Sequence, residues 1–167
     1  KNDIHAYVKA YYDVNDKIGL FADIQQRMVQ YDFLGYDNNL NNIQQTADLS
    51  FFNPKAGVNY QINKMHGVYG FVGLGNKEPN RNDYTNSTPQ SRPVHEQMTD
   101  IEIGYRFQSK SVFAHLNVYN MDYTNQLIIT GELNDVGAAI RTNVSDSYRR
   151  GIELSTGIKL LKNLELR

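Results

Sequence analysis

The sequence predicts an all-β protein, an antiparallel up-and-down transmembrane β-barrel that is present here as a partial segment of about seven to eight strands. Segments of about ten residues alternate apolar and polar side chains, which is the period of a strand with two different faces. Short and long connections alternate between these segments along the chain. Mean hydropathy is only −0.57, as expected when a single face of each strand is apolar.

Composition excludes several classes of protein. The 167 residues include 17 basic and 18 acidic side chains, which leave a net charge of −1. This balance offers no field that would attract nucleic acid. The absence of cysteine excludes a disulfide scaffold, a zinc-thiolate site and a cysteine nucleophile. No run of residues reaches the roughly 18 apolar positions of a membrane-spanning helix.

Five segments alternate clearly, namely residues 4–14, 17–33, 55–62, 99–108 and 149–160. In the clearest of them, Ile101, Ile103, Tyr105 and Phe107 oppose Asp100, Glu102, Gly104 and Arg106. Asp100 and Glu102 are interpreted as polar lining of a barrel interior, because any two residues on one strand face stand about 7 Å apart.

Two further segments are less regular. Residues 67–75 are apolar or glycine on both faces, so the sequence assigns them no register. Residues 111–129 favour one apolar face in their first half, and a bulge near Met121 fits the weaker pattern that follows.

The lengths of the connections favour lipid over a protein core as the solvent of the apolar faces. Tight connections at 14–17, 62–67, 108–111 and 161–164 alternate with long ones at 32–50, 78–97 and 131–139. The long ones are rich in Asn, Asp, Gly, Pro, Ser and Thr. A soluble antiparallel sheet explains the strand pattern equally well, but it gives no reason for this alternation. A transmembrane barrel has short turns on one side of the membrane and long loops on the other.

We expect residues 1–167 to be part of one outer-membrane barrel domain of a longer protein. The chain begins in strand-like alternation without an initiator methionine, and "LKNLELR" at its end reads as part of another strand. We recognise neither a plug domain nor barrel-closing strands in it, and no signal peptide.

The stretch "FFNPKAGVNYQIN" (51–63), followed by "GVYGFVGLGNKEPNRNDY" (67–84), resembles the TonB-dependent outer-membrane receptors. In that family a strand of the type F-N-P-K-x-G-x-x-Y leads through a short turn to a strand that ends in a Pro- and Arg-containing loop. The stretches "MTDIEIGYRFQ" (98–108), "NVYNMDYTNQLI" (117–128) and "RTNVSDSYRRGIELSTGI" (141–158) resemble the next three strands.

The resemblance implies a large plugged barrel of about 22 strands in the bacterial outer membrane, to which this chain contributes wall and loops. It also implies active uptake of a scarce nutrient, such as an iron chelate, a cobalamin or a glycan. The implied partners are the outer-membrane lipid bilayer, a small nutrient ligand and an inner-membrane TonB-type energy coupler that acts through the plug. No enzyme activity is expected.

The long connection at 78–97 carries the ligand-binding candidates Arg81, Tyr84, Arg92 and His95. The fork of an arginine can grip carboxylates or phosphates, and a tyrosine can stack on a ring or a sugar. The four histidines lack the spacing of metal ligands. The Gly-rich "GFVGLGNK" lacks the Lys-Ser/Thr ending of a phosphate loop. We therefore predict no catalytic residue, metal site or cofactor.

Two other functions remain open from the sequence. A small closed barrel of about eight strands would suit an adhesin or a structural protein. A soluble all-β carbohydrate-binding module would turn its apolar faces inward. Residues 101–107 distinguish the soluble module from a membrane barrel. In a soluble module their apolar side chains would lie beneath a second layer of the same chain.

Overall fold

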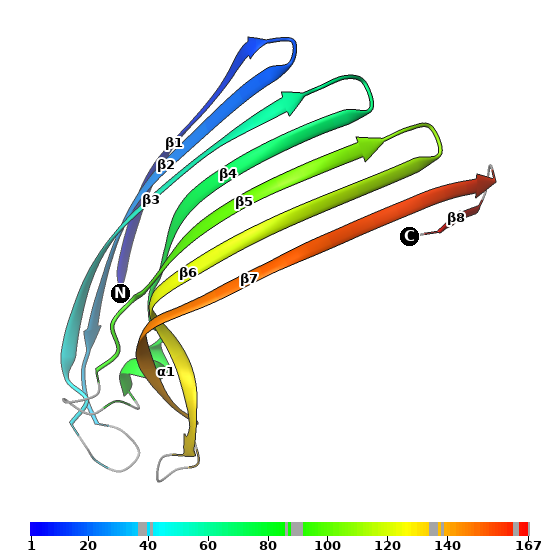
Figure 1. Cartoon of the computed structure of the whole chain (residues 1–167). Helices are drawn as coiled ribbons and strands as arrows, with labels where there is room; N and C mark the ends of the chain where they lie inside the picture. The colour runs from blue at the N-terminus through cyan, green and yellow to red at the C-terminus, as the bar shows by residue number, and fades with distance from the viewer. Residues whose placement is uncertain are drawn as a thin grey trace.

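The computed structural model describes residues 1–36, 40, 42–85, 87, 92–133, 137, 139–161 and 164–166. One antiparallel sheet contains its eight strands in chain order (Figure 1). The elements are β1 (Asn2–Asn15), β2 (Ile18–Phe33), β3 (Gln45–Gln61), β4 (His66–Lys77), helix α1 (Arg81–Thr85), β5 (Glu96–Gln108), β6 (Val112–Leu133), β7 (Ala139–Leu161) and β8 (Leu164–Leu166). Seven long strands and the start of an eighth confirm the predicted meander.

The sheet curves as a single open layer, with β1 at one edge and β8 at the other (Figure 1). On its convex face, Ile101 is 46% exposed, Ile103 65% and Ile152 72%. No second layer of described residues covers these side chains, so the arrangement is that of a transmembrane barrel wall rather than a soluble sheet. No helix in the described part of the chain is long and apolar enough to cross a membrane.

The tight turns use side chains as hydrogen-bond acceptors. The Asn15 carbonyl Oδ1 accepts from the backbone N–H groups of Lys17 and Ile18, at 2.9 and 3.0 Å. Asn63 repeats this arrangement between β3 and β4, and the Ser109 hydroxyl replaces it between β5 and β6. These side chains satisfy backbone donors that turns of two to four residues leave unpaired. We call this edge of the sheet the turn end, and the opposite edge the loop end.

Cross-strand register decides which side chains share a face. One row across the concave face runs from β1 to β7 as Tyr11, Phe21, Gly57, Phe71, Glu102, Tyr119 and Gly151. This row fixes the register of residues 67–75, which the sequence leaves open. Tyr69 and Phe71 lie on the concave face, and Val68 and Val72 lie on the convex face. The alternation in the regular strands follows the prediction.

Two predictions about strand details are corrected. The β6–β7 pairing continues through Met121, which lies opposite Arg149, and the register shifts instead between Ile129 and Leu133. The long connection predicted at 32–50 is shorter, because β2 and β3 pair as far as Phe33 and Gln45. Both corrections have one cause: ladder hydrogen bonds continue where the apolar alternation has faded, since backbone groups pair whatever their side chains are.

Glycines in the strands make room for aromatic rings on the concave face. A methyl group at Gly104 would overlap the ring of Tyr69, and one at Gly151 would overlap the ring of Tyr119. In each pair the glycine lies directly opposite the ring on the neighbouring strand. A ring that lies flat over a cross-strand glycine replaces the packing that the missing side chain would supply.

We expect Gly104→Ala to lower the free energy of unfolding of the full-length protein by about 1–3 kcal/mol, because the added methyl must displace a packed ring. Urea unfolding in lipid vesicles, followed by circular dichroism, measures this. Gly70→Ala in the adjacent strand is the matched control, since its nearest neighbour beyond the adjoining residues would be Val58 at 3.7 Å. Equal losses in the two variants would contradict the role of the Tyr69 ring.

Candidate functional site

The β4–β5 connection starts with a short helix whose first turn is capped by two side chains. The Asn80 N–H donates to Asp83 Oδ2 at 2.8 Å, and the Asp83 N–H donates to Asn80 Oδ1 at 3.0 Å. This reciprocal pair satisfies donors that a helix start leaves free. The spacing of three between Asn80 and Asp83 is the signal that could have predicted α1, which the sequence analysis missed.

Tyr84 anchors α1 in an aromatic cluster. Its ring is 4% exposed and lies 5.1 Å from the ring of Phe33 and 6.0 Å from that of Tyr31, centroid to centroid. The Gln45 side-chain amide also donates to the Tyr84 carbonyl at 3.1 Å. Tyr31 and Phe33 share the concave face with Phe21, because they lie at even spacing along β2. The helix therefore packs on the inner side of the sheet.

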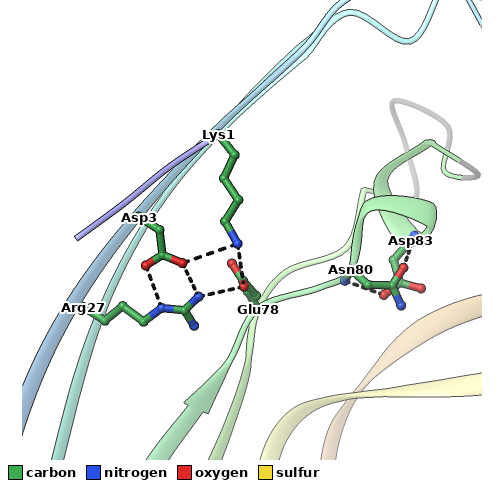
Figure 2. A network of polar contacts seen from close by, with 6 residues as sticks. All are labelled: Lys1, Asp3, Arg27, Glu78, Asn80 and Asp83. Carbon is green, nitrogen blue, oxygen red and sulfur yellow. Dashed lines mark hydrogen bonds and ion pairs between the residues drawn. The ribbon is translucent and has the colours of Figure 1, made fainter. Parts of the chain in front are cut away.

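An ionic network fixes the start of the same connection (Figure 2). The Arg27 guanidinium binds both oxygens of Asp3, at 2.9 and 2.6 Å, and reaches Glu78 Oε1 at 2.9 Å. Lys1 Nζ joins it, at 3.4 Å from Asp3 and 3.3 Å from Glu78. A bidentate Arg–carboxylate pair is stronger and more directional than a single ion pair. The network ties β1 and β2 to the residue that follows β4.

The other side of the connection contacts β7. Asp83 Oδ1 lies 3.6 Å from Arg141 Nη1. Further along, the Asn143 side chain accepts from the Val94 N–H at 2.9 Å and donates to the Val94 carbonyl at 3.0 Å. Figure 1 shows α1 between the loop-end parts of β2–β3 and β6–β7. The connection thus crosses the concave side of the sheet at its loop end.

The four predicted ligand contacts all lie on this connection, in different settings. Arg81 and Arg92 are exposed, and Tyr84 is buried in the aromatic cluster. His95 is half-buried, with its ring 5.4 Å from that of Phe51. Among the described residues, no hydrogen bond, ion pair or ring contact joins any two of the four. Their role in ligand binding therefore stays a prediction.

Acidic side chains gather in the middle of the concave face. Asp100 is 8% exposed, and its Oδ1 has no hydrogen-bond partner. Glu102 accepts from the Asn117 amide at 3.1 Å, and Asn117 in turn accepts from the Tyr69 hydroxyl at 2.9 Å. Glu153 lies opposite Asn117 on β7. Within the described ranges, none of these three carboxylates forms an ion pair. The burial of Asp100 favours a cationic partner here, since a buried carboxylate without one is costly.

Comparison with known proteins identifies the family. The family described as "TonB dependent receptor-like, beta-barrel" matches residues 1–166. The chain belongs to this family. The convex face of the receptor segment is therefore its lipid face, and the concave face is the wall of its lumen.

Solved structures agree with this assignment of the fold. The copper transporter OprC superposes with a TM-score of 0.84 at 12% identity, over 98% of this chain and 27% of that one. The siderophore receptor PirA from Pseudomonas aeruginosa superposes with a TM-score of 0.72 at 14% identity, over 98% and 30%. The hemophore receptor HasR from Serratia marcescens, in complex with its hemophore HasA and heme, reaches 0.73 at 14%, over 94% and 32%.

The TonB-dependent receptor segment spans less than a third of the length of each of these proteins. A comparison with curated protein sequences finds no significant match. The superpositions therefore show the fold of this chain.

Tyr84 supplies a pH-dependent test of the aromatic cluster. Burial, with added contributions from neighbouring Tyr31 and from the Glu78 and Asp83 carboxylates, raises the pKa of its phenol to about 12. An unfolded tyrosine titrates near pH 10. The Tyr84 packing should therefore be at full strength below about pH 10 and be lost as the pH rises through about 12.

The difference in tyrosinate absorbance between the full-length receptor and its Tyr84→Phe variant isolates this phenol. We expect the difference to appear near pH 12. A difference that appears near pH 10 would mean that Tyr84 is exposed to solvent.

Proposed function

We propose that this chain is barrel wall of a TonB-dependent receptor that takes up a scarce nutrient actively across the bacterial outer membrane. The observation that carries the proposal is the family match over residues 1–166. The alternation of tight turns and long connections supports the placement of the loop end at the cell surface. The exposed apolar side chains of the convex face, such as Ile101, Ile103 and Ile152, support a lipid environment for the strands.

Metal-containing cargo is favoured over a glycan. The names of the neighbouring structures refer to copper, a siderophore, and heme with its hemophore. An iron chelate is our leading candidate, followed by a cobalamin. Arg81 and Arg92 are the candidates for contacts with anionic groups of the ligand, because both are exposed on the connection that crosses the lumen mouth. Tyr84 and His95 are proposed to act mainly by holding this connection.

Energy is proposed to come from an inner-membrane TonB-type partner through a plug domain elsewhere in the protein. Asp100, which has a carboxylate oxygen without a hydrogen-bond partner, and the nearby Glu102 and Glu153, which have no ion-pair partner among the described residues, support a luminal neighbour with positive charge. Transport of this kind makes and breaks no covalent bond in the nutrient, so we propose no enzymatic role.

Uptake by cells tests the function. A strain that lacks the full-length gene should lose accumulation of radiolabelled ferric siderophore under iron limitation, and the gene supplied on a plasmid should restore it. Removal of the TonB-type coupler should abolish uptake in the complemented strain. Normal uptake in the deletion strain with several ferric siderophores and with cobalamin would refute the proposed cargo class.

We also expect the negative charge on the lumen wall to help to hold the plug. The double variant Asp100→Asn, Glu102→Gln should release the plug at lower urea concentration, because it removes two carboxylates that would face the plug's cations. Limited proteolysis of the purified full-length receptor measures this release. Asp122→Asn is the matched control, since Asp122 points away from the lumen and its side chain is 53% exposed. Equal sensitivity of all three proteins would contradict a cationic luminal partner.

A further inference from the structure

The segment Glu78–Thr85 joins two distant parts of the barrel wall. Glu78 contacts Arg27 on β2, and Asp83 contacts Arg141 on β7. These strands are five places apart in the sheet, which is about 24 Å along the wall at the usual strand spacing. Glu78 and Asp83 are only five residues apart, so their backbone spans at most about 18 Å. The side chains of Arg27 and Arg141 cover the remaining distance, so the segment links β2 and β7 across the concave side of the wall, and we call it the mouth bridge.

The contacts of the mouth bridge are of several independent kinds. Tyr84 supplies a buried aromatic anchor, Glu78 an ionic one and Asp83 both a helix cap and an ion pair. They reach β2, β3 and β7, with the β3 contact made by Gln45, and also Lys1, the residue before β1. Segments that open and close easily have few buried contacts and mostly solvent-exposed hydrogen bonds. The mouth bridge differs from such segments in its anchors: Tyr84 is 4% exposed, and the hydrogen bonds from Arg27 to Glu78 and from Gln45 to Tyr84 are partly buried. The helix-capping hydrogen bonds between Asn80 and Asp83 are exposed.

We propose that the mouth bridge is a fixed part of the lumen wall and not a movable lid. It narrows the loop end of the barrel permanently and sets the curvature of the wall between β2 and β7. Arg81 and Asn82, which are exposed on it, stand at constant positions beside the path of the cargo. Tyr84 and Glu78 are positioning residues for this surface. The proposal rests on the proposed function only for the existence of a cargo.

Spin-label distances test the proposal without any transport assay. The full-length receptor, in a cysteine-free background and in lipid nanodiscs, carries labels at Asn82 and at Lys110 in the β5–β6 turn. A second pair, at Thr124 and Lys110, records the width of the distance distribution for two sites joined by one strand, β6. We expect a single distribution for the Asn82 pair that is as narrow as the reference. A broad or bimodal distribution would overturn the proposal.

Variants then identify the anchors. The double variant Tyr84→Ala, Glu78→Gln should broaden the distribution for the Asn82 pair, whereas Tyr84→Phe should keep it narrow because the ring is retained. Tyr36→Ala, at a tyrosine that is 68% exposed, is the matched control and should change nothing. An unchanged width in the double variant would show that these two side chains do not hold the bridge. Because uptake is not measured, loss of the proposed function would leave these outcomes intact.

Discussion

The structure depends on one constraint: backbone N–H and C=O groups in a hydrocarbon layer must pair with each other, because no water is available to them. The antiparallel ladder between consecutive strands meets this constraint from β1 through β7. Once the ladder is formed, each residue has only two directions available, toward lipid or toward the lumen. The alternation of the sequence, the single-layer architecture and the low mean hydropathy all follow from this restriction.

The lumen side of the wall has a different chemistry from the lipid side. Aromatic rings there lie over glycines of the next strand, as Tyr69 does over Gly104, and stiffen this face of the sheet. Carboxylates such as Glu102 are tolerated there because they meet amide donors and the interior of the barrel rather than hydrocarbon. Rigidity and polarity together suit a wall that must hold its shape around whatever occupies the lumen.

At the loop end of the sheet, contacts between side chains hold the structure together. The strands β6 and β7 continue as a ladder past the apolar band, and residues at their loop end contact the β4–β5 connection. On the β2 side, the aromatic cluster around Tyr84 and the ion pairs of Arg27 hold the same connection. The chemistry of recognition and the geometry of the mouth are therefore built from contacts between strands that are far apart in the sheet.

Local pattern was sufficient for the strands, the faces and the tight turns of this protein. Period two follows from the ladder itself, and a turn residue such as Asn15 or Asn63 acts on donors two or three positions away. The sequence alone did not determine the register of residues 67–75, the unbroken pairing at Met121 or the burial of Tyr84. Those features depend on residues that are distant in the sequence, as when Tyr84 packs on Phe33 or Gly104 lies opposite Tyr69. Only the alignment and curvature of the complete sheet bring such residues together, because no local pattern records the distance between strands that are not adjacent.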